Sequence, residues 1–134
     1  MIVGIGTDLL DVARMERELG REGAGFRDDV FTPGETAYCR EMEHPARHFA
    51  VRYAAKEAFW KAVGNGPESV SLRDVEVERG EAGRPRLVLA GTARSAADRL
   101  GVTSALVSLT HTATLASASV VLEREPGAAD RRDG

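Results

Sequence analysis

Residues 49–64 hold the side chains best suited to chemistry, a carboxylate and an ammonium on one helical face. The stretch has no proline and no glycine before its last residue, so it is expected to be a helix. Glu57 and Lys61 are four residues apart and therefore lie one turn apart, on the same face as Ala50 and Ala54. The pair fits an ordinary surface ion pair, worth about 0.2–0.5 kcal/mol. It also fits a site, because small alanine neighbours leave room for a ligand beside both charges.

A second carboxylate, Asp8, ends an expected strand over residues 1–8. Gly4 and Gly6 lie on the same face of that strand as Asp8, because side chains alternate along a strand. The two glycines either open the face that Asp8 occupies or allow a neighbouring backbone to come close. A helix is expected from residue 11 to about residue 19. Taken alone, Asp8 therefore suits a helix cap as well as it suits a metal ligand.

Several common catalytic motifs are missing from the sequence. It has no GxxxxGK[ST] loop for phosphates and no GxSxG nucleophile motif, and the glycines at residues 4 and 6 are too few for a dinucleotide fingerprint. What remains suits Mg²⁺ and a pyrophosphate. Mg²⁺ takes oxygen ligands, commonly one or two carboxylates together with phosphate oxygens and waters. Asp8 and Glu57 are the carboxylates that fit this requirement.

The central stretch also resembles a known sequence signature. RYAAKEAFWKA at residues 52–62 is similar to the R-x-A-x-K-E-A-x-x-K-A signature of 4'-phosphopantetheinyl transferases, and within them to the small holo-acyl-carrier-protein synthase type. Further segments match in the same order along the chain. They are GIGTD at residues 4–8 followed by Arg14, FTPGE at residues 31–35, GRP at residues 83–85 and SLTHT at residues 108–112. The resemblance extends over residues 1–123.

The resemblance implies an enzyme and a reaction. Such enzymes transfer the 4'-phosphopantetheine arm of coenzyme A to a serine of an apo acyl carrier protein and release 3',5'-ADP. Asp8 and Glu57 would hold Mg²⁺ at the pyrophosphate, and Lys61 would stabilise charge on the leaving phosphate. His111 and a water relayed through Glu57 are equal candidates for the base that takes the serine proton. The alternative for His111 is a hydrogen-bonded residue at a strand end.

The resemblance also assigns binding residues. Those expected to contact coenzyme A are Arg52, Lys56, Gly64, Arg84, Pro85, His111 and Thr112. The expected carrier-protein docking surface is the first helix, where Arg14, Arg17 and Arg21 lie along one side at spacings of three and four. The alternative for these arginines is a solvated face with local ion pairs. A homotrimer with sites at the subunit interfaces is also implied.

The pattern FTPGE at residues 31–35 predicts the start of a helix. Thr32 can cap the helix, Pro33 suits its first position, and Glu35 completes a capping box. The helix is expected to continue to about Met42. A structural role is therefore preferred for Glu35 over a catalytic one.

The remaining segments predict a sheet and one more helix. Strands are expected over residues 74–79, 85–90, 105–111 and 115–122, and the last two are expected to form a hairpin. A short helix is expected over residues 92–100, with Thr92 as its N-cap and Gly101 as its C-cap. The expected fold is α+β, of the phosphopantetheinyl transferase type, with an antiparallel sheet and helices packed around the central helix.

Composition fits one soluble domain. The chain has 134 residues, of which 43% are apolar and 29% charged, and its formal net charge is −3. This charge favours neither nucleic acid nor membrane as a partner. The single cysteine, Cys39, excludes an internal disulfide and suits a reducing cytosol. No leader-like or membrane-spanning run is seen, and residues 124–134 are expected to form a disordered tail after a domain over residues 1–123.

Two other functions remain open on the sequence. One is a catalytically silent protein that binds coenzyme A or a nucleotide and serves in an assembly. The other is a related transferase that acts on the carrier domains of polyketide or peptide synthases. Mass analysis of an apo carrier protein incubated with coenzyme A, Mg²⁺ and this protein separates an enzyme from a binding module.

Overall fold

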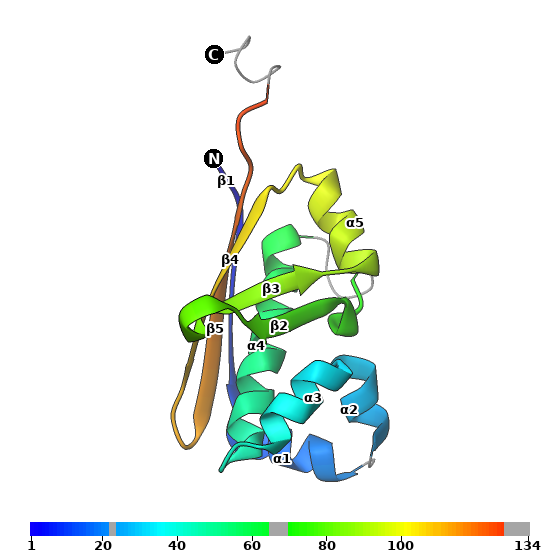
Figure 1. The fold of residues 1–134 in the computed structure, drawn as a ribbon, viewed down its shortest axis with the longest axis vertical. Helices are drawn as coiled ribbons and strands as arrows, with labels where there is room; N and C mark the ends of the chain where they lie inside the picture. Colours follow the sequence, from blue (N-terminus) through cyan, green and yellow to red (C-terminus); the bar gives the residue numbers. More distant parts are fainter. Residues whose placement is uncertain (22–23, 65–69, 128–134) are drawn as a thin grey trace.

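The computed structural model describes residues 1–21, 24–64 and 70–127 of the chain. Its centre is an antiparallel sheet in the order β1 (Ile2–Asp11), β5 (Leu115–Glu123), β4 (Ser104–His111). The helix α4 (Pro45–Val63) lies along one face of this sheet (Figure 1). β4 and β5 pair as the expected hairpin, so the antiparallel α+β arrangement predicted around the central helix is confirmed.

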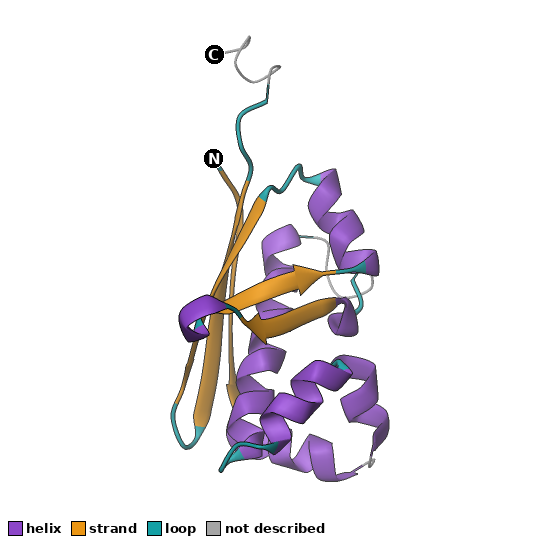
Figure 2. Ribbon diagram, in the orientation of Figure 1, coloured by secondary structure: helices purple, strands orange, loops and turns teal. Residues whose placement is uncertain are grey.

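The other elements surround α4 on the same side of the sheet. Three short helices gather at one end of α4: α1 (Val12–Arg21), α2 (Ala24–Val30) and α3 (Pro33–Arg40). A second, two-stranded sheet of β2 (Val75–Arg79) and β3 (Pro85–Leu89) crosses α4, and α5 (Gly91–Arg99) follows it. Short 3₁₀ turns at Leu72–Asp74 and Glu81–Gly83 flank β2. Figure 2 shows that the helices all lie on one side of the three-stranded sheet.

The ends of α4 follow from proline and glycine. Pro45 occupies the first turn after the N-cap residue His44, so the helix begins four residues before the stretch expected at residues 49–64. Gly64 ends it in a left-handed conformation with φ of 75°. The capping box of α3 is confirmed: the Glu35 amide donates to the Thr32 hydroxyl at 3.2 Å, and the Thr32 amide donates to Glu35 Oε1 at 3.0 Å.

Three local predictions require correction. Thr92 was expected to be the N-cap of α5, but it lies inside the helix, whose N-cap is Ala90. The side chain that satisfies the first turn is Asp74, whose Oδ2 accepts hydrogen bonds from both the amide and the hydroxyl of Thr92. Helix α2 was not predicted, since glycines surround its start. The expected tail begins later than residue 124, because Arg124 and Met1 exchange backbone hydrogen bonds. The rest of the tail (128–134) and most of the expected loop (65–69) lie outside the described residues.

Two glycines of β1 let its backbone lie directly against α4. A Cβ atom added to Gly6 would lie 1.9 Å from the Ala58 carbonyl oxygen, and one added to Gly4 would lie 2.2 Å from that of Ala62. No side chain fits at either position, and the helix presents only alanines there. Gly4 and Gly6 therefore allow close backbone approach, but the neighbouring backbone is that of α4 and not that of another strand in the sheet.

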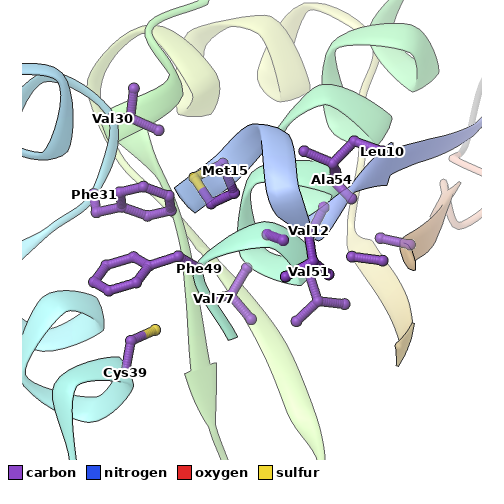
Figure 3. Packing of buried hydrophobic residues seen from close by; sticks show 14 residues of the cluster. Leu10, Val12, Met15, Val30, Phe31, Cys39, Phe49, Val51, Ala54 and Val77 are labelled. Carbon is purple, nitrogen blue, oxygen red and sulfur yellow. The ribbon is translucent and has the colours of Figure 1, made fainter. Parts of the chain in front are cut away.

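An apolar cluster connects the helical end of the molecule to the sheet. Phe31 and Phe49 pack edge to face with ring centroids 4.9 Å apart, and Met15 lies beside them (Figure 3). Leu10 and Val12 bring the end of β1 and the start of α1 into the same cluster. This packing holds α1 and α3 against α4.

The outer face of the three-stranded sheet carries exposed apolar side chains. Ile5, Leu9, Leu106 and Leu115 are exposed, at 70%, 64%, 53% and 41% of their full surface. They alternate along their strands with the residues that face α4, such as Gly6 and Ala116. Exposed apolar residues gathered on one sheet face are typical of protein–protein contact surfaces. Within the described residues, no helix is long and apolar enough to cross a membrane.

Replacing Gly6 with alanine is expected to lower the free energy of unfolding by about 2–3 kcal/mol, because the new methyl group overlaps the Ala58 carbonyl. Urea unfolding measures this change. The matched control is Gly20→Ala in α1, where nothing lies within 4 Å of the added atom. That variant should be as stable as the parent or slightly more so. Equal stability of the two variants would contradict the close approach of β1 and α4.

Candidate active site

Asp8 and Lys61 meet where β1 lies against α4. The Asp8 carboxylate accepts a hydrogen bond from Lys61 Nζ at 3.0 Å, and the same ammonium donates to the Thr7 carbonyl at 2.9 Å. The Asp8 side chain is only 10% exposed, whereas that of Lys61 is 56% exposed. Asp8 is therefore held within the protein, and Lys61 extends toward solvent.

Glu57 completes this cluster from the next turn of α4. Burial and the neighbouring Asp8 carboxylate raise the pKa of Glu57, although a hydrogen bond with the Tyr53 hydroxyl and the charge of Lys61 act in the opposite direction. Burial together with Glu57 raises the pKa of Tyr53, so its hydroxyl stays protonated and can donate to the carboxylate. Two acids thus share a partly buried position beside one ammonium.

The donor set of this cluster fits a hard cation. Asp8 Oδ2 is buried and has no hydrogen-bond partner in the part of the chain that the structure describes. Unsatisfied buried oxygens are rare in native proteins and often mark the place of a ligand. The described residues contain no group of three or more His, Cys, Asp and Glu side chains arranged for a metal. Two carboxylates are nevertheless enough for Mg²⁺, which keeps waters and substrate oxygens as its other ligands.

A second cluster, the cationic cluster, lies on another side of α4. Arg52 is five residues before Glu57, which places the two side chains about 140° apart around the helix. The Arg52 guanidinium lies over the Tyr38 ring at 4.3 Å. The His48 ring contacts both the Tyr38 ring, at 6.1 Å between centroids, and the His111 ring, at 5.2 Å.

The charges in the cationic cluster are mostly positive. Burial lowers the pKa of His48, and the nearby His111, Arg52 and Arg79 lower it further. Both guanidinium groups face Tyr38, with Arg79 at 5.7 Å from the ring centroid. The cluster is therefore suited to an anion rather than to a cation.

The cluster of Asp8, Glu57 and Lys61 and the cationic cluster lie apart within one chain. Asp8 pairs with Ala118 across β1 and β5, and Ala118 pairs with Leu109 across β5 and β4. His111 lies further along β4, so the whole of β5 separates its strand from that of Asp8. Two strand spacings amount to about 10 Å. Asp8, Glu57 and Lys61 therefore lie at one edge of the sheet, and His111 and Arg52 lie towards the other.

Lys56 was expected to contact coenzyme A, but its side chain lies in the protein core. Its side chain is completely buried, and Nζ donates to Glu35 Oε1 at 2.8 Å and to the carbonyls of Leu72 at 3.1 Å and Val75 at 2.5 Å. Glu35 Oε2 also accepts from the Val77 amide at 2.9 Å. All three ammonium donors are engaged by protein atoms. Direct contact between Lys56 and coenzyme A is therefore not supported, and its role is to join α3, α4 and β2.

The other predicted residues lie at the surface. Gly64 is the C-cap of α4, Arg84 ends the 3₁₀ turn before β3, and Pro85 begins β3. The Thr112 hydroxyl accepts from the Thr114 and Leu115 amides in the β4–β5 turn. Arg14, Arg17 and Arg21 are exposed on α1, and Arg21 lies 3.9 Å from Glu18.

Four site residues were missed by the sequence analysis: Tyr38, Tyr53, His48 and Arg79. Tyr53 precedes Glu57 by one turn, a spacing that gave a usable signal. His48 precedes Arg52 by one turn of α4, so the same kind of signal applied to it. Tyr38 and Arg79 are brought to the cationic cluster by the packing of α3 and β2 on α4, which no local pattern reveals.

Comparison with known proteins identifies the family of this chain. The family model for the 4'-phosphopantetheinyl transferase superfamily matches residues 4–116. The chain belongs to this superfamily. It is 47% identical over 126 residues to a holo-[acyl-carrier-protein] synthase of Anaeromyxobacter sp. (strain K), covering 92% of this chain and 97% of the relative. It is 41% identical over 125 residues to the synthase of Geobacter sp. (strain M21), covering 92% and 100%. The resemblance stated from the sequence is confirmed.

Solved structures of the superfamily share the fold. The holo-[acyl-carrier-protein] synthase of Neisseria meningitidis superimposes with a TM-score of 0.84 at 31% identity, covering 92% of this chain and all of that one. A synthase of Bacillus anthracis, solved in complex with CoA (3',5'-ADP), gives a TM-score of 0.76 at 32% identity, covering 93% and 99%. Both matches extend over nearly the whole chain, so the common fold includes the elements that carry the two clusters.

Replacing Lys56 with methionine is expected to lower the free energy of unfolding by about 3–5 kcal/mol, because it leaves the buried Glu35 carboxylate unpaired. Lys61→Met is the matched control, since its ion pair with Asp8 is exposed on the lysine side and such pairs contribute about 0–1 kcal/mol. Thermal and urea unfolding compare the two. If Lys61→Met proved the more destabilising variant, the structural role of Lys56 would be wrong.

Proposed function

We propose that this chain is a holo-[acyl-carrier-protein] synthase. It transfers the 4'-phosphopantetheine group of coenzyme A to a serine hydroxyl of an apo acyl carrier protein and leaves 3',5'-ADP. The observation that carries the proposal is the cluster of Asp8, Glu57 and Lys61, in which two acids with an unsatisfied oxygen lie beside a reachable ammonium. Family membership and the names of the relatives agree with it.

The reaction replaces a phosphoanhydride bond of coenzyme A by a phosphate ester bond to the serine. The serine oxygen attacks the phosphorus next to the pantetheine, and the bond from that phosphorus to the bridging oxygen of the pyrophosphate breaks. Asp8 and Glu57 would hold Mg²⁺, which when bound neutralises charge on the pyrophosphate oxygens. Lys61, half exposed and held by Asp8 and Thr7, reaches the charge that grows on the departing 3',5'-ADP. Tyr53 holds Glu57 in place through its hydrogen bond.

The serine proton has two candidate acceptors. Glu57 belongs to the cluster and can take the proton through a relayed water. His111 lies across the sheet from the cluster of the same chain. It can take the proton only if a neighbouring copy presents its β4 edge to the β1 edge of this one.

A homotrimer supplies such a neighbour, and two features support it. The first is the separation of the two clusters on different edges of the sheet, so that neither edge carries a complete set. The second is the outer sheet face with Ile5, Leu9, Leu106 and Leu115, whose exposure suits burial against other copies. The site would then lie between two copies, with Asp8, Glu57 and Lys61 from one and His111 with Arg52 from the next.

Helix α1 is the proposed docking surface for the carrier protein. Carrier proteins of this class are acidic, and the enzyme itself has a net charge of −3, so attraction must come from local positive charge. Arg14, Arg17 and Arg21 are exposed on α1. Arg14 also lines a cavity of about 130 Å³ with Leu10 and Tyr53, next to Glu57. A carrier bound on α1 would thus present its serine close to the carboxylates.

Mass spectrometry of an apo acyl carrier protein incubated with coenzyme A, Mg²⁺ and this protein tests the activity. We expect the carrier to gain one phosphopantetheine, and we expect Asp8→Ala and Glu57→Ala to abolish most of the gain while remaining folded by circular dichroism. Glu43→Ala, at an exposed position away from the cluster, is the control and should keep full activity. A chelator should stop the reaction, and added Mg²⁺ should restore it.

The outcomes of this assay separate the alternatives. Coenzyme A binding without transfer would favour a silent binding protein. Transfer only to the carrier domains of polyketide or peptide synthases would favour the other transferase class. Full turnover by both carboxylate variants in the presence of chelator would refute the two-carboxylate site.

Light scattering tests the assembly. The protein is expected to have the mass of three chains at micromolar concentration. Leu106→Lys should lower this mass because it places a charge in the proposed interface, whereas Arg94→Glu, on the surface of α5, should not change it. A fully active monomer would rule out a site shared between copies.

A further inference from the structure

The Lys61 ammonium compensates the two acids of the cluster formed by Asp8, Glu57 and Lys61. Its Nζ atom donates to Asp8 Oδ1 at 3.0 Å and to the Thr7 carbonyl at 2.9 Å. Its charge also acts to lower the pKa of Glu57, against the larger effect of burial. Lys61 therefore supplies the positive charge that a metal ion bound by Asp8 and Glu57 would also supply.

The two acceptors of Lys61 differ in what else they can bind. The Thr7 carbonyl is a neutral backbone group, held in place by the pairing of Thr7 with Ser119 and by the hydrogen bond from the Thr7 hydroxyl to the Ala118 carbonyl at 3.1 Å. The Asp8 carboxylate is charged and is the kind of ligand that Mg²⁺ prefers. A divalent cation therefore competes with the ammonium for Asp8 far more than for Thr7.

Asp8 and Lys61 also differ in their freedom to move. The Asp8 side chain is 10% exposed, and its Oδ2 atom is buried without a hydrogen-bond partner among the described residues. The Lys61 side chain is 56% exposed and reaches Asp8 from the solvent side. A cation held by Asp8 and Glu57 would lie close to Nζ, and like charges at such range repel each other most where water is excluded. Lys61 is thus the partner that can give way.

The residue type at position 61 suits an exchange of partners. Lys56 and Lys61 are the only lysines in the sequence, so arginine supplies the other basic side chains. A guanidinium grips a carboxylate through a planar fork, whereas an ammonium is a compact charge on a flexible stem. Lys56 is buried with its donors engaged by Glu35 and two carbonyls. Lys61 is therefore the only lysine that a reagent in solution can reach.

We infer that Lys61 is a displaceable counter-ion of Asp8, which neutralises the acids until a divalent cation binds and then leaves the carboxylate. This inference rests on the proposed function, because the cation is the one that Asp8 and Glu57 would hold. Thr7 keeps the ammonium at the cluster during the exchange. Once it has left Asp8, Nζ has donors for the phosphate oxygens of the substrate. Cation binding and the readiness of Lys61 are thus coupled.

Mn²⁺ binding to the protein alone, measured by electron paramagnetic resonance without coenzyme A or carrier protein, tests the competition. Lys61→Met should bind Mn²⁺ about tenfold more tightly than the parent, which is the size of effect that one neighbouring charge has on the proton affinity of an acid. Lys61→Arg keeps the charge and can still hold Asp8, so it should bind Mn²⁺ no more tightly than the parent.

The matched control is Arg14→Met. Arg14 lines a cavity with Tyr53, and its charge acts on the Tyr53 hydroxyl, but it forms no ion pair with Asp8 within the described residues. This variant removes the same charge near the cluster and should gain less than about twofold in Mn²⁺ affinity. Equal gains in Arg14→Met and Lys61→Met would overturn the inference, and so would no gain in Lys61→Met or no Mn²⁺ bound by any of the chains.

The rate at which an N-hydroxysuccinimide ester acetylates Lys61, followed by peptide mass spectrometry, reports its release directly. Addition of Mg²⁺ at constant ionic strength should speed this reaction several-fold, because Nζ loses its carboxylate partner. The Met1 amine, which donates to the Arg124 carbonyl, is the internal reference and should react at a constant rate. In Asp8→Asn, Lys61 should react equally fast with and without Mg²⁺. An unchanged rate in a parent that binds Mn²⁺ would contradict the release of Lys61.

The transfer assay separates this inference from the proposed function. If the parent transfers phosphopantetheine while Lys61→Met binds Mn²⁺ no more tightly than the parent, the function stands and the inference fails. If Lys61→Met binds Mn²⁺ more tightly but the parent transfers nothing, the competition for Asp8 stands and the function fails.

Discussion

The structure depends above all on the contact between β1 and α4. The backbones approach so closely at Gly4 and Gly6 that no Cβ atom fits, and Ala58 and Ala62 are the helix residues that receive them. This contact sets the register between strand and helix, and Asp8 lies two residues beyond Gly6 on the same strand face. The Asp8 carboxylate is thereby placed beside Glu57 and Lys61, which approach it from the next turns of the helix. The chemistry of the site thus follows from a packing requirement met by glycine and alanine.

A second constraint, the buried pair of Glu35 and Lys56, organises the other side of α4. Lys56 joins α4 to α3 through Glu35 and to β2 through the Val75 carbonyl. Tyr38 lies on α3, Arg52 on α4 and Arg79 on β2, so their common cavity exists only when these three elements are held together. Different sides of α4 therefore present a lysine in the core, a guanidinium at a cavity and the proposed catalytic residues. The trimer that we propose would bring the last two together between neighbouring copies.

The sequence predicted the parts of the fold that have local signals. The central helix is an unbroken run of helix formers ended by Gly64, and Thr32 with Glu35 forms a capping box within four residues. Asp8, Glu57 and Lys61 were identified through the ordered signature segments, and the structure brings them together. The role of Lys56 was not predictable, because its partner Glu35 is 21 residues away. The same holds for the cap of α5, which comes from Asp74, 18 residues before Thr92. A local pattern does not encode contacts of this range.

The central claim is that two edges of the sheet carry complementary halves of one site, and subunit mixing tests it most directly. Asp8→Ala and His111→Ala chains, each expected to be inactive alone if both residues serve the site, would be unfolded together in equal amounts, refolded, and assayed for phosphopantetheine transfer. If each site takes Asp8 from one copy and His111 from the next, random cyclic trimers should recover about a quarter of the parent activity. Either variant refolded alone should recover none. Absence of recovery in mixed trimers whose composition is verified by mass would contradict a site shared between copies.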